Sequence, residues 1–240
     1  MDAPAPADAA TNPGELRQQI EEVSGEPFND YMRRAVLSPL GMTRSTFVLP
    51  EGATNVAQSF DEQGEEEVLN NFSVPAAASL YTSAADLTRF LQANVAGADG
   101  ARPGRDVLAS LSLEEMRRPH AYQYGAEIWG LGTILYAPNN AGGFVVGHDG
   151  ANTPAINTSA RIDPASGDGI VVLETGDTRL ATDIAGEWVF WNTGSVDLFM
   201  AMADARRAFP ILGVGWLVIF ISTIVFCGFI AVRRRRRTSM

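Results

Sequence analysis

One short segment of this sequence joins an ionisable side chain to a backbone that a ligand can approach closely. Residues 147–151 read Gly-His-Asp-Gly-Ala, and His148 is one of only two histidines in the chain. An imidazole takes up and releases protons near neutral pH, which suits it to acid–base chemistry or to binding polar groups. The glycines on either side leave the backbone open to a neighbouring molecule. We therefore predict a site at this segment.

The segment ends one of four short apolar runs that predict an antiparallel meander. Turn-forming Gly, Pro, Asn and Asp separate the runs, as in sheets whose strands follow one another closely. The runs are Trp129–Tyr136, Gly142–Ala151, Ile156–Ile162 and Asp168–Thr175. This order predicts that residues 147–150 lie on an inner strand.

Three stretches with helical periodicity predict helices before and after the sheet. Apolar residues recur there at intervals of three and four, as on a helix with one buried face. The stretches are Glu15–Ser24, a segment that begins at Pro27 and is ended by Pro39–Met42, and Leu180–Trp191. We expect the last helix to pack on the sheet through Ile184, Val189, Phe190 and Trp191.

The region between the first helices and the sheet carries weaker signals. Ser83–Asp86 and Ser112–Glu115 are close to capping boxes, in which a Ser side chain satisfies backbone N–H groups at a helix start. Residues 43–81 show little periodicity and predict a long loop region. Its acidic run, Glu62–Glu67, is expected to be a solvated loop.

Composition excludes several kinds of chemistry. All 18 basic residues are arginines, so no mechanism can use a lysine of this chain. The first 210 residues carry a formal charge of −15, which repels nucleic acid. With a single cysteine, Cys227, and two distant histidines, His120 and His148, we expect no metal and no cofactor. We expect His120, in a loop after Pro119, to be structural or at the surface.

The C-terminal region predicts a membrane anchor. Ile211–Val232 is 22 residues without a charge, long enough to cross a hydrocarbon core of roughly 30 Å. Arg233–Arg237 follows directly, so the positive-inside rule predicts a cytoplasmic C-terminus and an extracytoplasmic domain. The expected organisation is a flexible lead-in (1–14), a folded domain (15–195), a juxtamembrane linker (196–210), a transmembrane helix (211–232) and a basic tail (233–240).

Five motifs in one order resemble the serine β-lactamase-related family, which includes class C β-lactamases, penicillin-binding proteins and esterases. They are Ile20–Phe28, Leu37–Phe47 with its Pro-Leu-Gly-Met, Pro75–Phe90, Trp129–Gly132 and Gly147–Gly150. The resemblance implies an α+β fold: part of a β-lactamase/transpeptidase-like domain, an antiparallel sheet with flanking helices. It also implies acyl transfer to a serine, on an amide or ester such as cell-wall peptide or a β-lactam.

The resemblance implies roles for five residues. Many members have a Gly-His-x-Gly segment where others have Lys-Thr-Gly, so His148 takes the position of that lysine, and the backbone N–H of Ala151 becomes an oxyanion donor. Gly150 would let the acyl group lie against the strand, and Asp149 and Asn152 would contact substrate. Other interpretations stay open: a backbone-bonded strand-end histidine for His148, and an Asx turn for Asp149.

The sequence departs from the family where the attacking group should be. Without lysine, the Ser-x-x-Lys motif cannot occur, and family spacing puts Asp8-Ala9-Ala10 where Tyr-x-Asn belongs. No export signal precedes the domain either, which favours missing upstream residues. We predict the C-terminal part of such a domain, without covalent turnover alone, and with an unpaired sheet edge and an exposed apolar face.

Three functional hypotheses follow from this combination. The first is a membrane-anchored fragment of a serine hydrolase whose N-terminal part lies elsewhere and is a partner of this chain. The second is a non-catalytic module that binds a peptide or small molecule in the same cleft. The third is a membrane-tethered interaction protein in which the sheet is only a scaffold.

Overall fold

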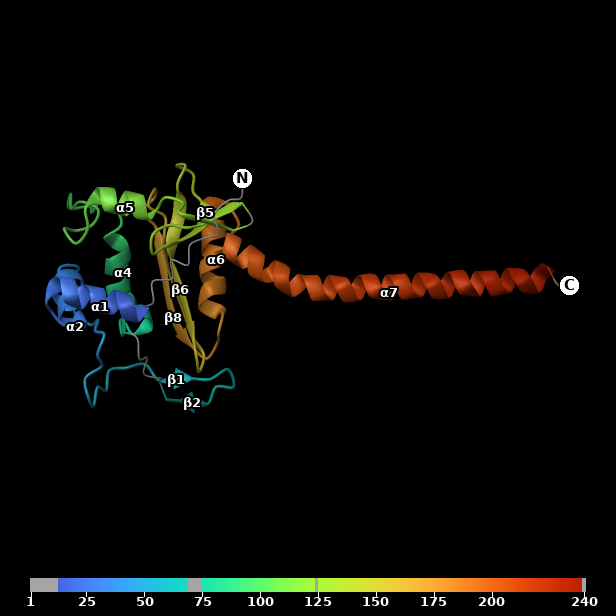
Figure 1. Ribbon diagram of the computed structural model, residues 1–240, viewed down its shortest axis with the longest axis horizontal. Coiled ribbons are helices and arrows are strands. Elements are labelled where there is room, and N and C mark those ends of the chain that lie inside the picture. Colours follow the sequence, from blue (N-terminus) through green and yellow to red (C-terminus); the bar gives the residue numbers. More distant parts are fainter. Residues whose placement is uncertain (1–12, 69–74, 124, 239–240) are drawn as a thin grey trace. The chain divides into compact units, whose positions relative to one another are not determined.

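The computed structural model describes residues 13–68, 75–123 and 125–238, which form two compact units (Figure 1). The first unit ends at Asp197 and combines a sheet with helices, and the second begins at Leu198. The predicted α+β organisation of the folded domain is therefore confirmed.

The main sheet is a six-stranded antiparallel meander in which every strand pairs with its neighbours in sequence. Its strands are β3 (Ala121–Gln123), β4 (Ala126–Trp129), β5 (Ile134–Pro138), β6 (Phe144–Asn152), β7 (Ile156–Ile162) and β8 (Gly169–Thr175). The residues of interest lie on β6, between β5 and β7, so the predicted inner strand is confirmed. The prediction of one strand over Trp129–Tyr136 was wrong, because a turn closed by a bond from the Gly130 N–H to the Thr133 carbonyl divides it.

Helices cover both faces of this sheet (Figure 1). On one face, α4 (Ala84–Gln92) packs on β7 and β8 and puts Leu91 into a core with Leu135, Val146 and Ile162. The predicted capping residue is confirmed, since Ser83 Oγ accepts a hydrogen bond from the Asp86 N–H at 3.2 Å. On the other face lies α6 (Leu180–Thr193), also packed on β7 and β8.

The side of α6 that meets the sheet differs from the predicted one. Ala181, Ala185 and Val189 are completely buried. These small residues, at intervals of four, let the helix approach the strands closely. Of the residues predicted to pack on the sheet only Val189 does so; the side chains of Ile184, Phe190 and Trp191 are exposed. An apolar side of α6 is thus left uncovered by the described residues.

Short helices and a small hairpin complete the first unit. They are α1 (Pro13–Ser24), α2 (Phe28–Met32) continued by the π-helix η1 (Arg33–Leu37), α3 (Pro75–Ala78), α5 (Ser110–Met116), and a small hairpin of β1 (Ser59–Phe60) and β2 (Glu66–Glu67). Two predictions need correction. Helix α5 begins at Ser110, without a side-chain cap, instead of at Ser112. The acidic run is not wholly loop, since its last two residues pair with β1.

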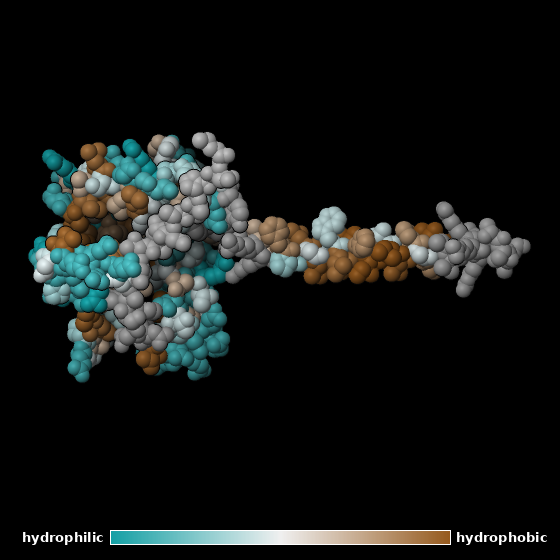
Figure 2. Space-filling model, viewed as in Figure 1, coloured by the Kyte–Doolittle hydropathy of each residue, from teal (hydrophilic) through white to brown (hydrophobic). Residues whose placement is uncertain are grey.

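The second unit consists of the helix α7 (Leu198–Thr238). Its stretch Ala208–Ile230 is 23 residues long and, by length and composition, apolar enough to cross a membrane. Figure 2 shows hydrophobic residues along the middle of this helix.

Candidate active site

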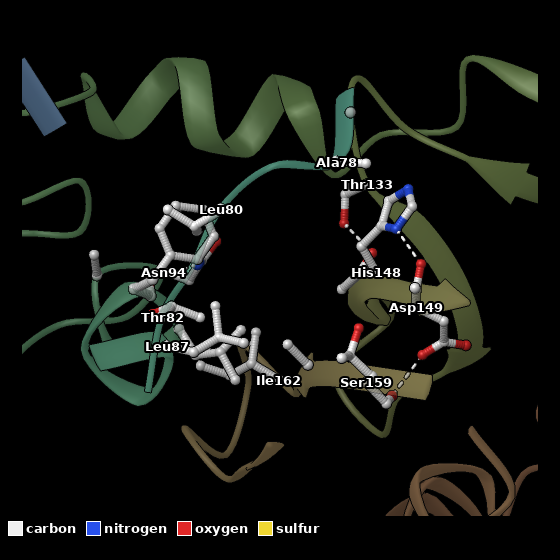
Figure 3. A pocket seen from close by; sticks show the side chains of 18 of the residues that line it. Ala78, Leu80, Thr82, Leu87, Asn94, Thr133, His148, Asp149, Ser159 and Ile162 are labelled. Carbon is white, nitrogen blue, oxygen red and sulfur yellow. Dashed lines mark hydrogen bonds between the residues drawn. The ribbon is translucent and has the colours of Figure 1, made fainter. Parts of the chain in front are cut away.

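A cavity of about 690 Å³ lies against the α4 face of the sheet. Its strand wall includes Val146, His148 and Ile162, and its helix wall includes Leu87 and Leu91 (Figure 3). Apolar side chains make up most of both walls. A cavity of this size and character can enclose a drug-sized molecule or a comparable group of protein side chains.

His148 stands at the polar part of this wall. It lies opposite Ala160 of β7, and its ring centroid is 5.6 Å from that of Trp129. Its Nδ1 is 2.6 Å from the backbone oxygen of Asp149. Because a carbonyl can only accept, Nδ1 is the donor of this hydrogen bond, and Nε2 is the ring nitrogen left for other contacts. His148 therefore both bonds to backbone, as one interpretation held, and presents an ionisable group to the cavity.

Two glycines let β6 and β7 approach closely beside His148. A Cβ on Gly147 would lie 2.0 Å from the Ala160 carbonyl oxygen and 2.8 Å from the Arg161 Cα. A Cβ on Gly150 would lie 2.6 Å from Thr158 Oγ1, a hydroxyl that can rotate away. Gly147 is therefore required by the sheet itself. Gly150 keeps the cavity wall flat next to the predicted oxyanion donor.

Asp149 turns its carboxylate away from the cavity, towards Ser159 (Figure 3). There it meets Arg161, whose side chain is fully buried and whose Nη2 lies 2.8 Å from Asp149 Oδ2. The Arg161 Nε also donates to Ser159 Oγ at 3.0 Å, and its Nη1 pairs with the buried carboxylate of Asp197. The predicted contact between Asp149 and a substrate stays a prediction.

The guanidinium of Arg161 also lies 3.8 Å from the ring centroid of Tyr136. Burial raises the pKa of the Tyr136 hydroxyl far above its usual range, and the negative charge of Asp149 raises it further. Burial alone would lower the pKa of Arg161, but Tyr136, Asp149 and Asp197 outweigh it and raise that pKa. The cluster is thus a buried ion-pair network behind the strand that carries His148.

The other two predicted site residues, Ala151 and Asn152, lie at the end of β6. Ala151 is exposed and lies opposite Asn157, whereas Asn152 Oδ1 accepts a bond from the Thr153 N–H at 2.8 Å. Asn157 is buried and ties this end of β6 to α6. Its Nδ2 donates to the Gly150 carbonyl at 3.0 Å, and its Oδ1 accepts from the Thr182 N–H at 2.9 Å.

Sequence reasoning missed two kinds of residue around this site. Arg161 and Asn157 act from the far face of the sheet, and strand alternation alone does not identify their partners. Ser79, from the loop before α4, lines the cavity with 8% of its surface exposed. Within the part of the chain that the structure describes, its Oγ has no hydrogen-bond partner.

The second histidine is not brought to the cavity. His120 Nε2 lies 3.2 Å from the Glu115 carbonyl oxygen, at the end of α5. Among the described residues there is no group of three or more His, Cys, Asp and Glu side chains that could hold a metal ion.

Comparisons with known proteins agree with this architecture. The family model described as Beta-lactamase matches residues 10–189. The D-alanine carboxypeptidase AmpC from Burkholderia cenocepacia is 18% identical, with a TM-score of 0.58 over 71% of this chain and 56% of that one. The β-lactamase/D-alanine carboxypeptidase from Pseudomonas syringae is 16% identical, with a TM-score of 0.58 over 74% and 57%.

A third structure extends the same result. The β-lactamase from Sulfitobacter sp. EE-36 is 16% identical, with a TM-score of 0.57 over 72% of this chain and 54% of that one. At these identities the likeness is one of fold. The chain spans little more than half the length of these proteins. No curated protein matches it.

Proposed function

The chain belongs to the β-lactamase family, and we propose that it supplies the sheet side of a serine acyl-transfer site. The substrate would be an amide or ester, such as cell-wall peptide or a β-lactam. The observation that carries this proposal is the arrangement on β6, where His148, Gly150 and Ala151 line one wall of the cavity.

Each of these residues has a chemical task in acyl transfer. When a serine oxygen attacks the substrate carbonyl, negative charge develops on the carbonyl oxygen, and the Ala151 N–H would donate to it. One such donor contributes roughly 3–4 kcal/mol to transition-state stabilisation. Gly150 leaves room for the acyl group to lie along β6. The Nε2 of His148 can bind a polar substrate group or transfer a proton.

The attacking serine would come from outside these 240 residues. In this family the serine is activated within Ser-x-x-Lys, and the chain has no lysine. The alignment with related structures supports the same conclusion. This chain covers only 53–57% of their length, so much of such a domain has no counterpart in these residues. The chain alone would bind substrate-like molecules at most, without forming a covalent intermediate.

We also propose that Ile211–Val232 crosses a membrane, with the C-terminus in the cytoplasm. Its support is the apolar stretch of α7 and the run Arg233–Arg237 directly after it, against only Arg206 and Arg207 before it. The acyl-transfer site would then lie outside the cytoplasm, where cell-wall substrates are found.

The purified full-length chain in detergent micelles tests the first proposal. We expect no covalent label after incubation with a fluorescent penicillin or a fluorophosphonate, because no serine in the chain has the activating lysine. Intact-mass spectrometry measures the adduct. A stoichiometric adduct on this chain alone would show that it contains a complete nucleophile of its own.

A further inference from the structure

The side chain of Asn157 on β7 is buried between β6 and α6, with 1% of its surface exposed. Its Oδ1 accepts a hydrogen bond from the Thr182 N–H at 2.9 Å. Its Nδ2 donates to the Gly150 carbonyl oxygen at 3.0 Å and to Thr182 Oγ1 at 3.1 Å. Because a backbone N–H can only donate, the atom that faces the Thr182 N–H is the amide oxygen, and the nitrogen faces Gly150. The orientation of this amide is therefore fixed.

The bond from Asn157 to the Gly150 carbonyl also acts on the N–H of Ala151, because the two groups belong to one peptide unit. This peptide bond is trans, and in a planar trans peptide the carbonyl and the N–H point in opposite directions. A bond that holds the carbonyl towards β7 therefore holds the N–H towards the other side of β6. A carbonyl that accepts a hydrogen bond also polarises its peptide unit, which makes the N–H a stronger donor.

The other side of β6 is open at this point. Strand β5 pairs with β6 only from Phe144 to Gly147, whereas β7 pairs with it as far as Asn152. Within the described part of the chain, no strand therefore lies on the β5 side of β6 at Ala151, and a substrate carbonyl can meet its N–H there. Ala151 lines the cavity, but Asn157 does not. Any influence of Asn157 on a substrate in the cavity must therefore pass through the peptide unit that it holds.

We propose that Asn157 is a positioning residue for acyl transfer, which aims the Ala151 N–H at the substrate oxygen that becomes negatively charged. Thr182 of α6 holds Asn157, and Asn157 holds the Gly150–Ala151 peptide unit. The inference rests on the proposed function, because it requires the oxyanion role of the Ala151 N–H. Since that charge develops only in the transition state, a misaligned donor slows acylation and leaves substrate binding nearly unchanged.

Asn157→Asp tests this role, because aspartate has nearly the same size and shape. An ionised carboxylate accepts but does not donate, so the Thr182 N–H keeps its partner and the Gly150 carbonyl loses its donor. The assembly of this chain with the polypeptide that supplies the serine is isolated from native membranes and labelled with a fluorescent penicillin at increasing concentrations. We expect the acylation rate constant at saturation to fall about tenfold, and the half-saturating concentration to change by less than about twofold.

Asn139→Asp is the matched control for a purely structural effect. Asn139 lies in the turn between β5 and β6, where its Nδ2 donates to Asp163 Oδ1 at 2.9 Å and its Oδ1 accepts from the Gly143 N–H at 2.9 Å. The change places two carboxylates side by side and weakens the fold at the other end of β6. We expect it to lower the fraction of protein that is labelled, without changing the rate constant of the fraction that reacts.

Nuclear magnetic resonance of the purified full chain in micelles tests the bond itself, without any reaction. With carbonyl-¹³C glycine and ¹⁵N alanine, the signal of the Gly150–Ala151 peptide unit should shift in Asn157→Asp and stay in place in Asn139→Asp. An unchanged signal, an unchanged acylation rate constant, or a loss of labelled fraction alone in Asn157→Asp would overturn the inference. An assembly without substitutions that takes no label would refute the proposed function instead, and the signal would still decide whether Asn157 holds this peptide unit.

Discussion

Replacing Arg161 with methionine is expected to destabilise the folded unit by about 3–5 kcal/mol. The methionine keeps much of the apolar volume but leaves two carboxylates without their cation. Asp197 is 1% exposed, and the side chain of Asp149 is 18% exposed. A buried carboxylate without a partner carries a large desolvation cost, so we expect a large effect at this position.

Urea unfolding of the full chain in micelles, followed by near-ultraviolet circular dichroism, measures this change. Arg118→Met is the matched control, because Arg118 also forms an ion pair, with Glu115 at 3.1 Å, but is largely exposed. Its loss should alter stability by no more than about 0.5 kcal/mol.

A triple variant tests whether the unpaired carboxylates cause the loss of stability. Adding Asp149→Asn and Asp197→Asn to Arg161→Met removes the unpaired charges, and should restore part of the lost stability. Equal effects of Arg161→Met and Arg118→Met would mean that the network behind β6 does not hold the domain together.

His148→Ala is expected to slow acylation by about tenfold or more. The acylated species is the assembly of this chain with the polypeptide that supplies the serine, isolated from native membranes. The variant removes an ionisable side chain that β6 presents to the cavity, and leaves the backbone of Gly150 and Ala151 in place. The measured quantity is the second-order rate constant for labelling by a fluorescent penicillin or a fluorophosphonate.

His120→Ala is the natural control, since it removes the other histidine of the chain at a position that does not line the cavity. We expect its labelling rate to match that of the unchanged protein. An unaltered rate for His148→Ala would assign His148 a structural role beside Trp129.

Much of the fold was predictable because its signals are local. Short runs separated by Gly, Pro, Asn and Asp identified β6, β7 and β8. Ser83 with Asp86 three residues later identified the start of α4. The division of residues 129–136 was missed because its turn, around Gly130 and Gly132, interrupts an otherwise apolar run.

What could not be predicted depends on contacts distant in sequence. Arg161 is one polar residue in an alternating strand, and its acidic partners lie 12 and 36 residues away. Periodicity also could not tell which apolar residues of α6 meet the sheet. Leu180, Ile184, Phe190 and Trp191 have the composition of buried residues, yet the described chain does not cover them.

The sequence predicted the position of the site on β6. Only the structure showed which residues of β6 lie on the cavity face of the sheet and which lie on the α6 face. Both His148 and Asp149 are polar neighbours on β6, but strand alternation turns the first towards the cavity and the second towards Arg161. The role of Gly147 could not be predicted either. Only the register of β6 against β7 shows that a Cβ at this position would clash with the backbone of β7.

The central claim is that this chain supplies the substrate-binding strand and an oxyanion donor of an acyl-transfer site. The attacking serine of that site lies outside residues 1–240. Residue-level mapping tests it most directly: native membranes are treated with a fluorophosphonate, the assembly containing this chain is isolated, and the modified peptide is sequenced by mass spectrometry. The account predicts a modified serine within Ser-x-x-Lys, outside residues 1–240. A modified serine inside the chain, or an assembly that carries no modified serine, would contradict it.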